Sequence, residues 1–135
     1  MVVQDVFSRF LWTEALVTKT PEEVAQAFEK ILQRAGTAPR SLTSDVGPEW
    51  SGNFARMLDS KGIISFQKWP EDKNAIATLD VVMGQLKKQL VRDTRRLGTN
   101  DWASRLQKVT DGKNQNPIED YLEGQAPADV EETKI

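Results

Sequence analysis

The sequence contains no cysteine and no histidine among its 135 residues. Disulfide bonds, and zinc sites built from cysteine and histidine, are therefore excluded. No apolar run approaches the roughly 18 residues that a membrane-spanning helix requires, so we expect no membrane partner. The first residues show neither the basic region nor the apolar core of a signal peptide, and we expect no secretory leader.

Neither sign of charge dominates overall, but charged residues are unevenly distributed along the chain. The formal net charge is −2, with 39% hydrophobic and 28% charged residues, a composition typical of one small globular domain. Between Gly84 and Lys108 there are seven basic and two acidic residues, whereas seven acidic residues and two lysines follow from Asp111 onward. Because charges act over about 8 Å at physiological salt, the basic segment is compatible with binding to phosphate groups.

Short β-branched and aromatic runs alternate with segments of helical periodicity, which is the pattern of an α/β domain. We expect strands at residues 1–6, 9–17, 41–44 and 63–68, and helices at residues 21–35, 54–60, 75–97 and after a cap at 99–101. The first two strands form a hairpin. Beyond Gly112 the polar and acidic composition predicts an irregular tail. Four tryptophans are better explained by packing than by base stacking: Trp12, Trp50, Trp69 and Trp102.

The helix at residues 21–35 has recognisable signals at both ends. Thr20 can accept a hydrogen bond from the free amides of the first turn, and Pro21 suits the first helical position. Glu23, three residues after Thr20, predicts a capping box. Gly36 is the expected stop.

Two acidic residues on separate elements are candidates for a shared metal site. Asp45 stands where a short strand ends in the loop Asp45-Val46-Gly47-Pro48-Glu49, and Asp80 stands near the start of the longest helix. Carboxylate oxygens are the ligands that Mg²⁺ prefers. Taken alone, Asp45 is better explained as a turn aspartate, and Asp80 is equally well explained as an acid favoured by the helix dipole.

The wider motif resembles the catalytic core of retroviral and retrotransposon-type integrases. Ser44-Asp45-Val46-Gly47-Pro48-Glu49-Trp50 is similar to the family's Thr-Asp-x-Gly-x-Glu-Phe pattern, which contains its second catalytic acid. Asp5-Val6-Phe7-Ser8-Arg9 resembles the family's turn between strands 2 and 3, and Pro127-Ala128-Asp129-Val130 resembles a Pro-Ala-x-Val motif beyond the core. The resemblance covers roughly residues 1 to 130.

The resemblance implies an RNase H-like mixed sheet flanked by helices, and metal-dependent polynucleotidyl transfer on DNA. Asp45 and Asp80 would hold Mg²⁺ or Mn²⁺ and act as catalytic residues. In place of Asp80 the family has Glu, so the side chain here is shorter by about 1.5 Å, and we expect weakened metal ligation. Lys87, Lys88 and Arg92 would contact nucleic acid. A solvated helix face is the alternative for these three residues.

Two departures from the family pattern concern the start of the chain. Asp5 falls where the family closes its second strand, so the resemblance does not make it a ligand; the first catalytic acid lies on an earlier strand. In the family's strand order 3-2-1-4-5, that earlier strand is central. We therefore expect a core that lacks its first strand and first acid, truncated at its N-terminus and inactive by itself.

We expect a partial integrase core at residues 1–112, followed by the tail at 113–135. Its function would be cleavage and joining of DNA ends in a mobile element or a gene derived from one, with a possible homo-oligomer and nuclear action inferred from the DNA substrate. The main alternative is a non-catalytic DNA-binding or oligomerisation module that kept the scaffold. A translated relic that does not fold is a third possibility.

Overall fold

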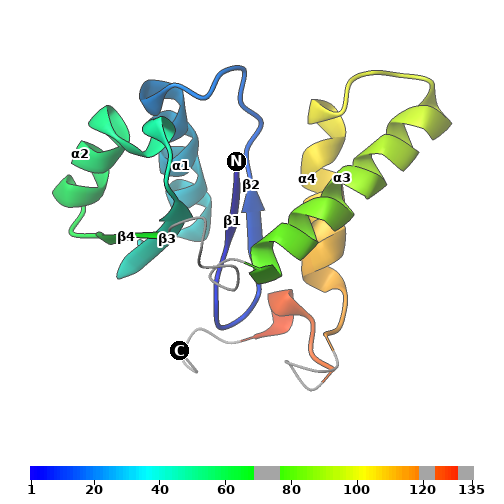
Figure 1. Cartoon of the computed structure of the whole chain (residues 1–135). Coiled ribbons are helices and arrows are strands. Elements are labelled where there is room, and N and C mark those ends of the chain that lie inside the picture. Colours follow the sequence, from blue (N-terminus) through cyan, green and yellow to red (C-terminus); the bar gives the residue numbers. More distant parts are fainter. Residues whose placement is uncertain (69–76, 119–123, 131–135) are drawn as a thin grey trace. The chain divides into compact units, whose positions relative to one another are not determined.

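The computed structural model describes residues 1–68, 77–118 and 124–130 (Figure 1). It divides into two compact units, and each is described by itself. The first unit comprises Met1 and Glu14–Asp80, and the second comprises Val2–Thr13 and Val81–Ile135. Helices and strands alternate, which confirms the predicted α/β class. Residues 75 and 76 of the predicted long helix, and Trp69, lie outside the described residues.

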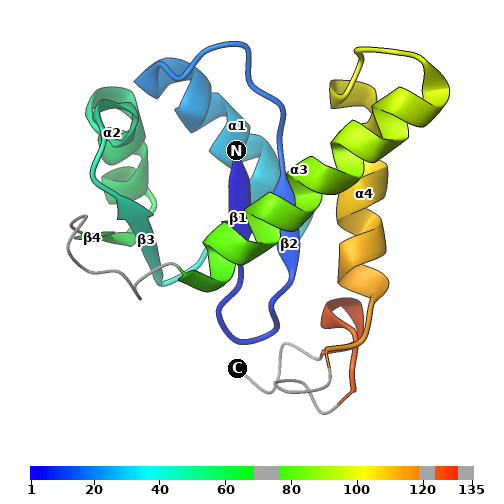
Figure 2. The ribbon, with the colours of Figure 1, turned by 45° about the vertical axis from the view of Figure 1, so that its right-hand side comes forward.

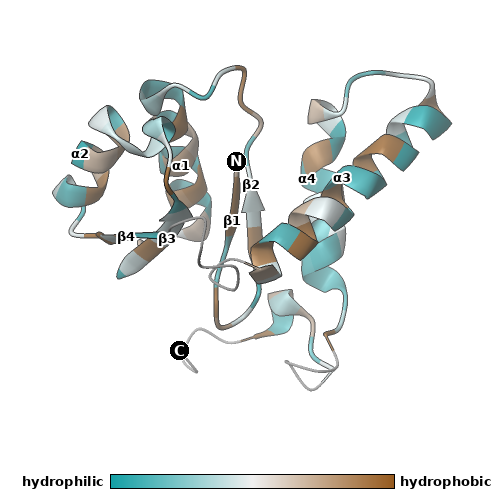
Figure 3. Ribbon diagram, viewed as in Figure 1, coloured by the Kyte–Doolittle hydropathy of each residue, from teal (hydrophilic) through white to brown (hydrophobic). Residues whose placement is uncertain are grey.

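A parallel pair of strands and two helices form the first unit. Strand β3 (Ser41–Asp45) pairs with β4 (Ile64–Lys68) in a register that runs from Ser41 opposite Ile64 to Asp45 opposite Lys68. Helix α1 (Pro21–Ala35) packs against α2 (Gly52–Ser60) and against the short 3-10 helix η1 (Pro48–Trp50), and α2 also contacts β4. Hydrophobic and hydrophilic residues alternate around α1 in Figure 3, as expected for an amphipathic helix.

Both ends of α1 confirm the predicted boundaries. The Thr20 hydroxyl accepts a hydrogen bond from the Glu23 amide (3.3 Å), and the Gly36 amide donates to the Leu32 carbonyl (2.9 Å) with Gly36 at φ 76°. One detail of the capping box differs from the prediction. The Glu23 carboxylate accepts its hydrogen bond from the Thr18 amide (2.9 Å) instead of the Thr20 amide, because the chain before the helix bends back within its reach.

Only apolar side chains are buried in the described part of the first unit. Phe28 and Phe54 lie at its centre with ring centroids 5.6 Å apart, and Trp50 meets Phe54 edge-on at 5.2 Å. The buried residues come from α1, α2 and the entry to β4: Val24, Ala27, Phe28, Ile31, Phe54, Leu58 and Ile63.

The second unit joins a hairpin to two long helices. Strand β1 (Val2–Gln4) pairs antiparallel with β2 (Leu11–Thr13). Helix α3 (Ala77–Leu97), whose first turn is assigned to the first unit, continues into this unit and crosses α4 (Ala103–Gln115), as Figures 1 and 2 show. An apolar cluster joins the two helices: Leu86, Leu90, Leu106 and Val109, with Val2 and Val82 packed against it.

The two hairpin strands are shorter than the predicted strands at residues 1–6 and 9–17. The connection folds into a wide turn, in which one Asp5 carboxylate oxygen accepts hydrogen bonds from the Ser8 amide (2.8 Å) and the Ser8 hydroxyl (2.7 Å). Arg9 adopts φ 64° in this turn. Asp5 therefore has a structural role in the turn, and that it is not a metal ligand stays a prediction.

Polar contacts hold α4 against β2. The Asn114 side-chain amide accepts a hydrogen bond from the Leu11 amide (2.8 Å) and donates one to the Leu11 carbonyl (2.9 Å). The hydroxyls of Thr13 and Thr110 lie 2.7 Å apart, and both residues are buried. These contacts connect residues about 100 positions apart in the sequence, so sequence patterns along the chain do not reveal them.

Helix α4 and the following residues extend the ordered structure beyond the predicted end at Gly112. The helix continues to Gln115, Ile118 forms an isolated bridge with Gln125, and the 3-10 helix η2 (Pro127–Asp129) packs against α4. An interior glycine weakens a helix by about 1 kcal/mol, which is too little to end one that is packed by Val109 and Asn114. Trp102 is 46% exposed, so it is partly buried and not part of the core.

The strand pairs match the expected order with its first strand left out. Among the described residues, the backbone of β1 pairs only with β2, and that of β3 only with β4. The hairpin is the predicted 3-2 pair and the parallel strands are the predicted 4-5 pair.

Candidate metal centre and nucleic-acid interface

Asp45 lies at the carboxyl end of β3, where the chain leaves the sheet. It is exposed, and its Cα lies opposite that of Lys68 on β4. Pro48 then opens η1, and the Ser51 hydroxyl donates to the Pro48 carbonyl (2.6 Å), which fixes the loop beyond the strand. Carboxyl ends of parallel strands are common ligand-binding positions in α/β sheets, so the carboxylate is placed where a ligand can reach it.

Glu49 and Trp50 pack differently in the loop after Asp45. A side chain built on Gly47 would approach within 2.5 Å of a Glu49 carboxylate oxygen, so Gly47 leaves the space that Glu49 occupies. Trp50 packs on Phe54, and its indole nitrogen is buried without a hydrogen-bond partner among the described residues. Glu49 is half-buried instead of being the freely exposed loop residue that its position suggests.

Asp80 lies in the first described turn of α3 and is exposed. Its position near the amino end of the helix suits a carboxylate, because the helix dipole favours negative charge there. Within residues 1–68, 77–118 and 124–130, neither Asp80 nor Asp45 has a hydrogen bond or ion pair through its carboxylate. Both carboxylates are thus available to an added cation.

The residue types fit a partly hydrated Mg²⁺ or Mn²⁺ better than a fully enclosed ion. Mg²⁺ usually keeps several waters and binds through one or two carboxylates plus substrate phosphates. The described residues contain no group of three acidic, histidine or cysteine side chains that could hold a metal. Two accessible aspartates meet the smaller requirement, and that they share one ion stays a prediction.

The three predicted nucleic-acid contacts fall on two different faces of α3. Successive helical residues turn by about 100°, so Lys87 lies within roughly 20° of Asp80 around the helix, and Gly84 lies roughly 40° from Asp80 on its other side. Lys88 and Arg92 are turned away from Asp80 by roughly 80° and 120°. All three cations are exposed, but only Lys88 and Arg92 line a groove on the second unit.

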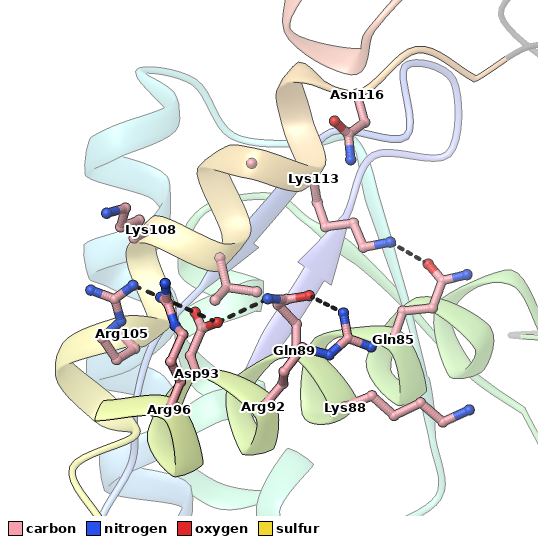
Figure 4. A pocket seen from close by; sticks show the side chains of 12 residues that line it. Gln85, Lys88, Gln89, Arg92, Asp93, Arg96, Arg105, Lys108, Lys113 and Asn116 are labelled. Carbon is pink, nitrogen blue, oxygen red and sulfur yellow. Dashed lines mark hydrogen bonds and ion pairs between the residues drawn. The ribbon is translucent and has the colours of Figure 1, made fainter. Parts of the chain in front are cut away.

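That groove lies between α3 and α4 and has a volume of about 640 Å³ (Figure 4). Sequence reasoning did not identify the residues that α4 contributes to it, including Arg105, Lys108 and Lys113. A signal was present on α3, because Lys88, Arg92 and Arg96 recur at four-residue intervals and must share one helix face. The α4 residues of the groove could be identified only from the way the two helices pack.

Comparison with known proteins shows which fold these elements form. No protein-family model matches the chain. The chain is 27% identical over 131 residues to the transposon-derived protein F54H12.3 of Caenorhabditis elegans, which covers 97% of this chain. It spans 45% of that relative's length.

Solved structures are more informative about the fold. The chain superposes on a chain of the simian T-cell lymphotropic virus intasome in complex with PP2A regulatory subunit B56 gamma with a TM-score of 0.84 and 18% identity, covering 94% of this chain and 45% of that one. It superposes on the HTLV-2 integrase catalytic core domain in complex with magnesium, in a trimeric form, with a TM-score of 0.80 and 19% identity, covering 96% and 81%. The chain therefore has the fold of a retroviral integrase catalytic core.

No helix in the described ranges is both long and apolar enough to cross a membrane.

Proposed function

We propose that this chain is an integrase-type catalytic core unit of a transposon-derived protein, and that it serves metal-dependent cleavage and joining of DNA. The proposal rests on two observations taken together. The chain superposes on an integrase catalytic core over 96% of its length, and Asp45 and Asp80 lie where the motif resemblance places two of the catalytic acids. One carboxylate ends the parallel strand β3 and the other opens α3, and both are exposed. A DNA substrate implies action in the nucleus.

In this proposal Asp45 and Asp80 supply carboxylate oxygens to Mg²⁺ or Mn²⁺. The bound metal would activate a water or 3′ hydroxyl and stabilise the leaving oxygen. Lys87 lies on the same face of α3 as Asp80 and would bind the phosphate backbone beside the reacting bond. Self-association is part of the proposal, since the HTLV-2 core was solved in a trimeric form.

Metal binding by single variants tests the assignment of the two acids. We expect Asp45→Asn and Asp80→Asn each to lower Mn²⁺ affinity by more than about tenfold. Loss of a residue that only supports a ligand can already cost about tenfold, and loss of the ligand itself should cost more. Asp80→Glu should raise affinity, because the longer side chain restores the reach of the family's residue. The measurement is a titration followed by electron paramagnetic resonance of free Mn²⁺.

A matched control separates a specific site from general surface charge. Asp59 is an exposed acid on α2, so Asp59→Asn removes the same charge away from the proposed site. Equal losses in Asp59→Asn and Asp45→Asn would contradict the assignment.

A non-catalytic DNA-binding module is the second candidate function. It is favoured by the finding that the described residues hold no group of three candidate metal ligands. Nicking of supercoiled DNA and Mn²⁺ binding together separate the two functions. Nicking that disappears in Asp45→Asn and Asp80→Asn supports catalysis, whereas DNA binding by a chain that binds no Mn²⁺ supports the module.

A further inference from the structure

The described residues that line the groove between α3 and α4 carry a large excess of positive charge. Among them are six basic side chains and a single carboxylate (Figure 4). The basic residues come from both helices: Lys88, Arg92 and Arg96 from α3, and Arg105, Lys108 and Lys113 from α4. Like charges gathered at one place repel each other and attract anions, so this surface is suited to a negatively charged partner.

The one carboxylate of the groove is already engaged by the protein. Asp93 is 7% exposed, accepts a hydrogen bond from Gln89 (2.9 Å) and pairs with Arg105 at 3.5 Å and Arg96 at 3.9 Å. It holds α3 and α4 together by its contact with Arg105. One carboxylate cannot neutralise six cations, and the groove keeps a net positive charge.

Neutral glutamines hold two of the remaining cations in place. The Lys113 ammonium donates to the Gln85 side-chain carbonyl (2.6 Å), and Arg92 donates to that of Gln89 (3.4 Å). These partners orient the cations without neutralising them. In the part of the chain that the structure describes, Lys88 and Lys108 have no hydrogen bond or ion pair. A purely solvated face would not need such oriented cations from two helices.

The spacing of the cations suits an extended anion. Lys88, Arg92 and Arg96 lie four residues apart, which is about 6 Å along a helix, and together they span about 12 Å. One strand of duplex DNA presents a phosphate every 3.4 Å or so along its axis. The three cations on α3 therefore span about three phosphates, and the cations of α4 line the same groove.

We propose that the groove between α3 and α4 binds the phosphate backbone of duplex DNA as a site separate from the Asp80–Lys87 face. The choice of DNA over other polyanions rests on the proposed function, but the binding itself needs no metal. The two faces are turned apart on α3, so the groove would hold a stretch of DNA other than the reacting bond.

Gly112 provides a test that leaves the packing untouched. It lines the groove, and a side chain added there meets nothing within 4 Å. Gly112→Glu places a negative charge in the groove, Gly112→Lys a positive one, and Gly112→Ala none. Each change also removes an interior helical glycine, so helix stability should rise in all three variants.

The experiment is fluorescence anisotropy of a labelled 20-base-pair duplex, with EDTA present, at several salt concentrations. We expect Gly112→Glu to weaken binding about fivefold, the factor for one unit charge about 4 Å from a phosphate in water. Gly112→Lys should tighten binding, and Gly112→Ala should leave it unchanged. Lys88→Gln and Arg92→Gln should each reduce the slope of log affinity against log salt by about 0.9.

Ala103 gives the matched control, since it is exposed in the first turn of α4 and does not line the groove. Equal weakening by Ala103→Glu and Gly112→Glu would overturn the proposal, because charge alone would then explain the loss. So would a duplex that does not bind. If polyglutamate displaced the duplex at equal charge concentration and showed the same Gly112→Glu sensitivity, an acidic protein segment would replace DNA as the partner.

The design keeps this inference apart from the proposed catalytic function. Asp45→Asn and Asp80→Asn should leave duplex binding in EDTA unweakened. Loss of Mn²⁺ binding in those variants with normal groove binding would separate the two sites. Groove binding in a chain that binds no metal would retain this inference while the catalytic proposal fails.

Discussion

The two units of the chain close their interiors in different ways. Every buried residue in the described part of the first unit is apolar, with Phe28 and Phe54 at the centre. The described part of the second unit adds five buried polar or charged residues to its leucine and valine cluster: Ser8, Thr13, Asp93, Thr110 and Asn114. An apolar core is stabilised by close packing of side-chain volume and by the apolar area it buries. Buried polar groups stabilise a core only when each has its hydrogen-bond partner.

The difference matters most where α4 meets the hairpin. Asn114 offers one acceptor and one donor to the backbone of Leu11, as a neighbouring strand would. The Asn114 side chain thus takes the place of a neighbouring strand. It fixes the position of α4 along β2, because a shift of the helix by one residue would remove both hydrogen bonds. The second unit is thus expected to be more specific in its packing, and the first more tolerant of apolar exchange.

Phe54→Ala should have the largest effect on stability. Phe54 is 1% exposed and contacts both Phe28 and Trp50, and truncating a buried phenylalanine costs about 3–5 kcal/mol. Urea unfolding gives the loss, and hydrogen exchange should show faster opening in α1 and α2. Phe54→Leu, which keeps most of the volume, should lose much less. Equal losses in the two variants would contradict a core held by volume.

Asn114→Ala should have the next largest effect. It leaves the amide and the carbonyl of Leu11 without their partner, and each buried unpaired group costs about 1–3 kcal/mol. Exchange should accelerate at β2 and α4, but not in α1. Gln115→Ala, at an exposed position of the same helix, should change stability little. Similar losses at the two positions would show that the Asn114 contacts contribute little.

The paired hydroxyls of Thr13 and Thr110 allow a double-mutant cycle. Thr13→Val or Thr110→Val alone should cost about 1 kcal/mol or more, because each change removes the hydrogen bond between the two buried hydroxyls, and Thr110→Val also removes the bond that Thr110 donates to the Leu106 carbonyl (2.8 Å). With both changes together, apolar groups of the same shape replace the pair, and the total loss should be smaller than the sum. Additive losses would mean that the two hydroxyls do not interact.

Gly84→Ala should give the smallest effect, and it should be stabilising. A side chain at Gly84 meets nothing within 4 Å, and replacing a glycine inside a helix gains about 1 kcal/mol. Gly84→Lys should stabilise α3 too, and should in addition raise DNA affinity because it adds a cation beside Asp80 and Lys87. An equal DNA affinity for the two variants would argue against a DNA contact on that face.

Local signals in the sequence predicted most elements of the fold. Thr20, Pro21 and Gly36 located α1, because caps act within one turn of the helix and are written in neighbouring residues. The strand before Asp45 was predicted within one residue. The hairpin was less accurate, since its turn depends on the Asp5 carboxylate bonding to Ser8, an alternative to strand pairing that composition does not reveal.

The candidate site was predicted only in part for the same reason. Asp45 and Asp80 could be selected by motif, and the structure exposes both. Lys87, Lys88 and Arg92 were selected by motif and charge, and the structure places the last two in the groove. Their contact with nucleic acid stays a prediction. Arg105 contacts Asp93 on another helix, and Asn114 contacts Leu11 on a strand. Both roles depend on tertiary packing, which local sequence patterns do not encode.

The most direct test of a shared metal centre is the position of Mn²⁺ in crystals of this chain, located by its anomalous scattering. If Asp45 and Asp80 share one ion, a peak lies within coordination distance of both carboxylates and is lost in Asp80→Asn crystals. A peak on other residues, or Mn²⁺ bound by only one of these two aspartates, would contradict a shared metal centre.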